Sequence, residues 1–155
     1  MAKKLFITGT GTDIGKTYVT GLILKKLQES GRRVAYYKAA MSGNERDADG
    51  RLIPGDALHV KTVSGITQPL KTMCPYVYEA AVSPHLASRL EGDPVQLDVV
   101  KAGFEKVCGA YDYVTVEGSG GIVCPIDFDN SKLQLEDVIG ELDLSSILIA
   151  DAGLG

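Results

Sequence analysis

Cysteine and histidine are scarce in this chain of 155 residues, which has three cysteines and two histidines. Cys74, Cys108 and Cys124 are widely spaced, and neither a C-x-x-C motif nor a neighbouring histidine pair accompanies them. This pattern argues against both a disulfide framework and a zinc site, so we expect reduced, mostly buried thiols. His59 and His85 have no spaced partners, and we interpret them as surface or core residues.

Long apolar runs are also lacking. No apolar stretch approaches the length of a membrane span, and residues 1–7 do not contain the apolar h-region of a secretory signal peptide. We therefore expect a cytoplasmic protein that has no membrane partner.

Positive charge is not concentrated anywhere in the chain. Lysine and arginine number 16 against 20 acidic residues, the net charge is −4, and no basic run interleaved with aromatics occurs. A nucleic-acid surface is therefore not expected, and a small-molecule partner is. The 45% hydrophobic and 23% charged residues are typical of a soluble globular domain that can bury a core.

The start of the chain carries the most specific motif. An apolar strand at Leu5–Ile7 runs through small residues into Gly15-Lys16-Thr17. In the G-x-x-x-x-G-K-[ST] pattern the first glycine would fall on Thr10, but it lies at Gly9, so the loop is one residue longer. A strand before and an amphipathic helix after are the required context, and they predict a phosphate-binding loop. An ordinary glycine-rich turn is the alternative.

Helical and strand patterns alternate along the rest of the chain. We predict helices over 16–30, 56–63, 84–91, 95–107 and 135–142, and strands over 34–38, 73–78, 111–117 and 146–150, the last a continuous, buried-type run. This alternation predicts an α/β fold: a single P-loop NTPase-like domain over residues 1–155, with a mostly parallel sheet and helices on both faces.

Ligands of such a sheet gather at the carboxyl ends of its strands. Four segments follow such ends and should converge, namely residues 9–17, 38–43, 117–121 and 153–155. The polar segment Met41–Pro54 is long for a connection, so we interpret it as a binding loop.

Three oxygen-bearing side chains are candidate Mg²⁺ ligands. Glu117 ends an apolar strand, where a lone carboxylate is costly unless it is paired or bound to metal. Thr17 supplies a hydroxyl, and Asp56 could add a second carboxylate. Alternatively, Glu117 caps a neighbouring amide and Asp56 is a helix N-cap residue.

Lys38 follows a strand whose predecessor in sequence carries the phosphate loop, so its ammonium should face the transferred group and stabilise charge during phosphoryl transfer. A solvated strand-end lysine is the alternative. Ser42 is a less specific donor that could simply form a turn. The tyrosines on or near the strands, including Tyr36 and Tyr37, are interpreted as packing residues.

Five segments, in the same order along the chain, together resemble the dethiobiotin synthase family. Members of this family are ATP-dependent carboxylases that close the ureido ring in the biosynthesis of biotin. They are Thr8–Thr17, Tyr37–Lys38 with Ser42–Gly43, Asp56–Leu58, Ser83–His85 and Val116–Gly121. Lys38-Ala39-Ala40 replaces the Lys-Pro of many members but leaves Lys38 and Ser42 in register.

The resemblance implies roles for these positions. Lys38 would be the catalytic lysine, and Lys16 would act with it while contacting the nucleotide phosphates. Thr17, Asp56 and Glu117 would surround Mg²⁺. ATP would be bound by Thr12, Asp13, Ile14, Gly15, Lys16, Thr17, Tyr18, Asp56, Glu117, Gly118, Ser119 and Gly120, and the substrate by Thr12, Ser42, Gly153 and Leu154.

The implied reaction is carboxylation of 7,8-diaminononanoate with CO₂ or bicarbonate, followed by ring closure through carbamate and carbamoyl-phosphate intermediates. The family continues beyond the length of this chain, so we expect an N-terminal portion that lacks the C-terminal part of the fold, and a homodimer in the full-length form. Three other readings stay open: a partitioning or switch ATPase, a related amide-forming ligase, and an inactive truncated fold.

Overall fold

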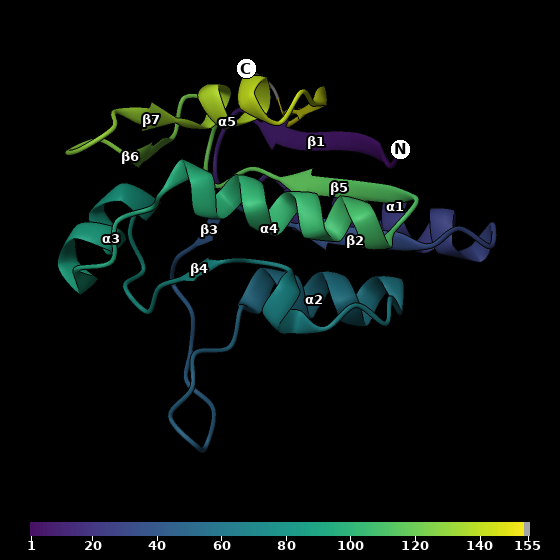
Figure 1. Cartoon of the computed structure of the whole chain (residues 1–155), viewed down its shortest axis with the longest axis horizontal. Helices are drawn as coiled ribbons and strands as arrows, with labels where there is room; N and C mark the ends of the chain where they lie inside the picture. The colour runs from purple at the N-terminus through teal and green to yellow at the C-terminus, as the bar shows by residue number, and fades with distance from the viewer. Residues whose placement is uncertain (154–155) are drawn as a thin grey trace.

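A computed structural model describes residues 1–153 of the chain. At its centre is a four-stranded parallel sheet (Figure 1). In spatial order its strands are β2 (Val34–Tyr37), β5 (Tyr113–Glu117), β1 (Lys3–Gly9) and β8 (Ser145–Ile149). The predicted parallel sheet is therefore confirmed.

Two short strand pairs accompany this sheet. β3 (Ala40–Met41) pairs in parallel with β4 (Tyr76–Val77), and β6 (Pro125–Asp127) pairs antiparallel with β7 (Leu133–Gln134). The sequence patterns did not predict the β6–β7 hairpin, because its strands are too short to show a period.

The predicted helices are all present, with ends displaced by three residues at most. They are α1 (Lys16–Glu29), α2 (Gly55–Ser64), α3 (Pro84–Glu91), α4 (Leu97–Ala110) and α5 (Leu135–Glu141), and a short 3-10 turn, η1, spans Leu70–Thr72. Among the described residues no helix is both long and apolar enough to span a bilayer.

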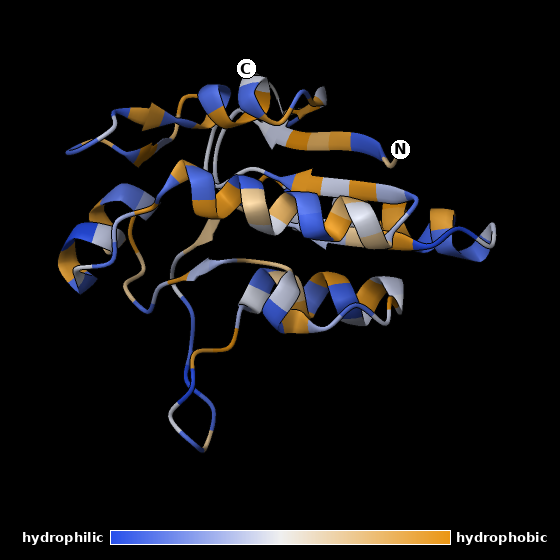
Figure 2. Cartoon of the chain, in the orientation of Figure 1, coloured by the Kyte–Doolittle hydropathy of each residue, from blue (hydrophilic) through white to orange (hydrophobic). Residues whose placement is uncertain are grey.

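Alternate residues of β2 point to opposite faces of the sheet, as strand geometry requires. Tyr36 packs in a cluster with Leu24 of α1 and Val60 of α2, whereas Tyr37 packs with Phe104 of α4. Helices therefore cover both faces, as predicted. Figure 2 shows hydrophobic residues along β1 and β5, and hydrophilic residues in the loop that projects between β3 and α2.

The strand β8 differs from its prediction. Its apolar run predicted a strand buried on both faces, but Ile147 and Leu148 are 44% and 57% exposed. β8 lies at the edge of the sheet, and β1 is its only partner among the described strands. The apolar run predicted the strand correctly, but within the described residues its side chains are not covered as the run predicted.

At the opposite edge a side chain takes the place of a neighbouring strand. The buried Gln68 accepts a hydrogen bond from the backbone N–H of Tyr36 at 2.8 Å and donates to its carbonyl at 3.0 Å. Both backbone groups of this edge residue are thereby satisfied away from water. The amide of Gln68 thus holds β2 at the position of Tyr36.

Replacing Gln68 with alanine is expected to lower the free energy of unfolding by about 2–4 kcal/mol, because a buried donor and a buried acceptor lose their partner. Denaturant unfolding measures the change. Gln28→Ala is the control, since its amide nitrogen bonds only the Gly65 carbonyl near the surface and its buried Oε1 has no hydrogen-bond partner among the described residues. A loss of less than about 0.5 kcal/mol is expected there. Equal losses in the two variants would contradict the role of Gln68 in holding β2 at Tyr36.

Candidate active site

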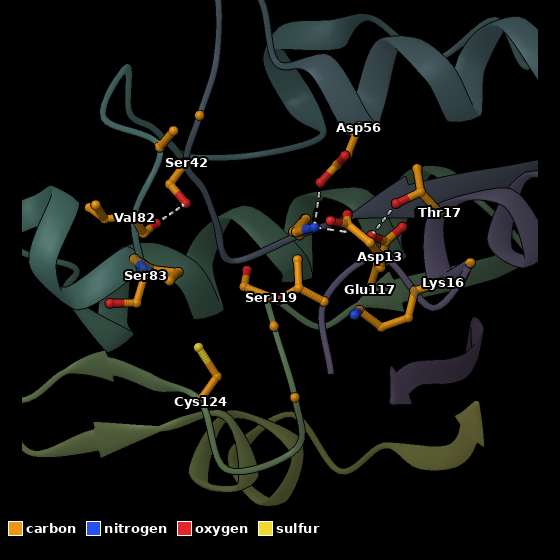
Figure 3. A pocket seen from close by; sticks show the side chains of 18 of the residues that line it. Asp13, Lys16, Thr17, Ser42, Asp56, Val82, Ser83, Glu117, Ser119 and Cys124 are labelled. Carbon is orange, nitrogen blue, oxygen red and sulfur yellow. Dashed lines mark hydrogen bonds and ion pairs between the residues drawn. The ribbon is translucent and has the colours of Figure 1, made fainter. Parts of the chain in front are cut away.

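A cavity of about 1040 Å³ opens at the carboxyl ends of the sheet strands. Figure 3 shows side chains from the loop after β1, the segment after β2, the start of α2 and the end of β5 converging on it. The predicted site residues that line it are Thr12, Asp13, Gly15, Lys16, Thr17, Tyr18, Lys38, Ser42, Asp56, Glu117, Ser119 and Gly120. The fold therefore brings together residues that lie more than 100 positions apart in sequence.

The loop between β1 and α1 turns into the helix through a left-handed residue. Gly15 has φ +93° directly before α1, a conformation that glycine adopts without a steric penalty. Lys16 begins the helix, is 7% exposed, and donates a hydrogen bond to the Gly11 carbonyl. Its pKa is lowered by burial and by the nearby charge of Lys38. The first turn of α1 and a buried ammonium thus face one cavity, an arrangement suited to an anion.

The side chain of Lys38 lies between two carboxylates. Its Nζ is 2.6 Å from Oδ2 of Asp56 and 3.0 Å from Oε1 of Glu117. Lys38 and Glu117 are 5% and 2% exposed, whereas the Asp56 side chain is 40% exposed. Burial by itself would lower the pKa of Lys38, but the charges of Glu117 and Asp56 and the hydrogen bonds to them outweigh it, so the pKa is raised. Lys38 is a buried, ion-paired positive charge, not a solvated strand-end lysine.

Glu117 connects three elements of the fold. Its Oε1 also accepts a hydrogen bond from Thr17 Oγ1 at 2.9 Å, and its Oε2 accepts one from Tyr36 Oη at 3.3 Å. Burial and the charge of Glu117 raise the pKa of the Tyr36 hydroxyl, so this group remains a donor at neutral pH. A buried carboxylate at this strand end is thus fully engaged with partners.

The donor set at this point fits a divalent cation. The carboxylates of Asp56 and Glu117 and the hydroxyl of Thr17 lie around a position beside the phosphate loop. Both carboxylates already bind a positive charge there, the ammonium of Lys38. Hard cations such as Mg²⁺ prefer such oxygens together with phosphates and water. Within residues 1–153 no group of three or more histidine, cysteine or acidic side chains is close enough to form a metal site alone. Phosphate oxygens or water would complete the coordination.

Two serines of the predicted site hold loops together. Ser42 Oγ donates to the Val82 carbonyl at 2.6 Å, and Ser119 Oγ donates to the Ala40 carbonyl at 2.6 Å. Within the segment Met41–Pro54, which was predicted to be a binding loop, only Ser42 and Gly43 line the cavity. Residues 45–53 project away between β3 and α2 (Figure 1), so the structure gives no contact between that part of the segment and the cavity.

Other predicted positions do not line the cavity. Ile14 and Gly118 are absent from its wall, and Gly153 is exposed after β8. Gly118 donates its N–H to the Ile7 carbonyl at 2.9 Å, so it joins β5 to β1. Leu154, predicted to bind substrate, lies outside the described residues.

Sequence reasoning missed several lining residues. Tyr36 supports the site although it was interpreted as packing only, and His59, interpreted as a surface or core residue, lines the cavity. His59 lies one helical turn after Asp56 on α2, which is the signal that could have found it. The other lining residues that were given no role of their own are Gly43, Ala81, Val82, Ser83, Pro84, Gly121, Val123 and Cys124. Of these, Gly43 and Gly121 lie in segments that were predicted to converge. Cys74 is buried as expected, whereas Cys108 and Cys124 are only partly buried.

Comparisons with known proteins show the family of the chain. A family model described as an AAA domain matches residues 3–155. The ATP-dependent dethiobiotin synthetase BioD of Clostridium botulinum (strain Loch Maree / Type A3) is 50% identical over 155 residues, which cover 100% of this chain and 68% of that protein. The chain belongs to the ATP-dependent dethiobiotin synthetase family.

Two more relatives carry the same name. The synthetase of Brachyspira hyodysenteriae (strain ATCC 49526 / WA1) is 49% identical, with 100% of this chain and 68% of that protein covered. That of Clostridium novyi (strain NT) is 50% identical, with 100% and 65% covered. The chain thus spans about two thirds of the length of these family members, and the resemblance inferred from five short segments is confirmed.

Solved structures give a weaker comparison. Two crystal structures of the signal recognition particle receptor FtsY from Elizabethkingia anophelis align with 96% of this chain and with 41% and 40% of theirs. Their TM-scores are 0.43 and 0.47 at 13% and 14% identity. At this level of similarity they add nothing to the functional argument.

Proposed function

We propose that this protein acts as an ATP- and Mg²⁺-dependent dethiobiotin synthetase, which carboxylates 7,8-diaminononanoate and closes it to a cyclic urea in biotin biosynthesis. Membership of the family supports this proposal. The observation that carries it is the buried ammonium of Lys38, which lies between Asp56 and Glu117 in the cavity of the phosphate loop.

The reaction proceeds in three steps. One amine of the substrate adds to CO₂ and loses a proton, which gives a carbamate. A carbamate oxygen then attacks the γ-phosphorus of ATP, so that carbamoyl phosphate forms and ADP leaves. The second amine attacks the carbonyl carbon, loses its proton and expels phosphate, which leaves the cyclic urea.

Each step develops or transfers negative charge, and the cavity contains positive groups that can stabilise it. Lys16 and the backbone N–H groups of the loop bind the ATP phosphates, and Lys38 stabilises the charge on the transferred phosphoryl group and the carbamate. The side chains of Thr12 and Ser42 contact the diamine. No enzyme nucleophile is required, because the substrate supplies every attacking atom.

Thr17, Asp56 and Glu117 would hold Mg²⁺. When bound, this ion neutralises phosphate charge and aligns the terminal phosphoryl group. For Asp56 and Glu117 to take that role, the ammonium of Lys38 must leave their oxygens. It is then free to face the transferred group, which is where its charge is needed.

Further parts of the proposal concern the full-length protein. Gly153 and Leu154 would contribute to a backbone site for the substrate carboxylate at the interface of a homodimer, and the protein would act in the cytoplasm on small molecules, without nucleic acid or membrane.

The proposal is tested by measuring phosphate release from ATP by the full-length protein. Release is expected only when 7,8-diaminononanoate and bicarbonate are both present, with one phosphate for each ring closed. Release without either substrate would indicate a switch or partitioning ATPase, and release with a different amine and acid would indicate another amide-forming ligase. No turnover with any of these would contradict the proposal.

A further inference from the structure

The hydroxyl of Tyr36 makes a contact that packing does not explain. Tyr36 is fully buried, yet its Oη donates to Oε2 of Glu117 at 3.3 Å. Thr17 and Lys38 instead contact the other oxygen, Oε1, at 2.9 and 3.0 Å. The two oxygens of one carboxylate thus have different partners. Oε1 contacts residues that line the cavity, whereas Oε2 contacts a residue of the core beneath the sheet.

The sheet register explains how Tyr36 reaches Glu117. Tyr36 on β2 lies opposite Thr115 on β5. Glu117 is two residues further along β5, so its side chain leaves the same face of the sheet as that of Thr115. Diagonal neighbours of this kind are within reach of an aromatic side chain. The parallel register therefore places the phenol hydroxyl beside the carboxylate.

The position of the Tyr36 ring is itself constrained. The backbone N–H and carbonyl of Tyr36 are both bonded to the amide of Gln68. Its ring belongs to the buried cluster that includes Leu24, Met41 and Val60. A side chain fixed at both its backbone and its ring can hold another group in place, because little of its own freedom remains to be lost.

We propose that Tyr36 is a positioning residue for the metal–nucleotide site. Its hydroxyl holds Oε2 of Glu117 toward the sheet, so that Oε1 is presented to the cavity beside Thr17. Without this hydrogen bond the plane of the carboxylate can rotate about its terminal torsion, so the oxygen that faces the cavity no longer has a defined direction toward the cation. The inference rests on the proposed function, since it assumes that Glu117 is a ligand of Mg²⁺.

Tyr36→Phe removes the hydroxyl and retains the ring. In the full-length protein, we expect a rise of about 10-fold in the Mg²⁺ concentration at which half of the Mg²⁺-dependent gain in ATP affinity is reached. This is the lower end of the effect of removing a hydrogen bond that orients a metal ligand. ATP affinity in the presence of EDTA should not change. Isothermal titration calorimetry with ATP over a series of Mg²⁺ concentrations measures both quantities without any turnover.

The adjacent residue provides a matched control. Tyr37 is 1% exposed, and its hydroxyl donates to the Val100 carbonyl at 2.8 Å on the other face of the sheet. Tyr37→Phe therefore removes an equally buried hydroxyl that does not touch Glu117. It should lower the melting temperature and leave the Mg²⁺ dependence unchanged.

The outcomes separate the inference from the function on which it rests. If the unsubstituted protein binds ATP with no dependence on Mg²⁺, the proposed Mg²⁺ site is wrong. If it does depend on Mg²⁺ but both phenylalanine variants shift equally, or neither shifts, the positioning role of Tyr36 is overturned and the function stands.

A double substitution tests whether Tyr36 acts through Glu117. In a Glu117→Gln background, Tyr36→Phe should cause little additional change in the Mg²⁺ dependence, because the group that Tyr36 positions is already altered. The same 10-fold change in both backgrounds would show that Tyr36 acts by another route. Circular dichroism of all variants confirms that each is folded.

Discussion

Replacing Lys38 with methionine is expected to lower the rate of phosphate release at saturating substrates by about 10²–10³-fold, the usual loss when one preorganised donor to a charged transition state is removed. Methionine retains the apolar part of the side chain and removes the charge. Lys38 is 5% exposed, and its Nζ lies 3.0 Å from Oε1 of Glu117. Steady-state release of phosphate by the full-length protein measures the effect.

ATP binding should respond differently to this change. The ammonium of Lys38 occupies the carboxylate oxygens that we assign to Mg²⁺, so its removal should not weaken Mg²⁺-dependent ATP binding. Lys4→Met is the control, because the half-buried Lys4 donates to the Leu142 carbonyl at 2.7 Å and does not line the cavity. Unchanged turnover in Lys38→Met would remove Lys38 from the catalytic role.

The second large effect is expected at Lys16, and it should appear in binding. Lys16→Ala removes a buried cation, 7% exposed, from the first turn of α1. Loss of one partner of a buried charge pair costs about 2–5 kcal/mol, so ATP affinity should fall by about 30-fold to several thousand-fold. Calorimetric titration with ATP in the presence of Mg²⁺ measures this loss directly.

The matched control for Lys16→Ala lies on the same helix. Lys25 is exposed and does not line the cavity, so Lys25→Ala should leave ATP affinity unchanged. If Lys16→Ala retained full affinity, the loop before α1 would not be the phosphate site. The contrast between a binding defect at Lys16 and a turnover defect at Lys38 is a stricter test than either variant alone.

Local patterns predicted most of the fold because the helices and the longer strands each carry their own periodicity. Pro84–Glu91 was predicted to the residue, since serine before a helix and proline at its first position both depend on the local backbone. The β6–β7 hairpin was missed because strands of three and two residues are too short to show a period.

The phosphate loop was predictable for a similar reason. Its function requires small residues and Gly-Lys-Thr in direct succession, followed by a helix, and all of this is local in sequence. The positions of Lys38 and Glu117 at strand ends were also predictable, because parallel strands deliver their carboxyl ends to one edge.

The amino-acid sequence by itself thus determined the α/β class, the phosphate loop and the residues that follow each strand. Only the tertiary structure decided that Lys38 lies between Asp56 and Glu117, that Tyr36 supports one oxygen of Glu117, and that β8 is an exposed edge. These are contacts between residues up to 81 positions apart, or consequences of strand order. Periodicity determines toward which face of its own helix or strand a side chain points. Strand order and register determine which side chains of other elements it contacts on that face.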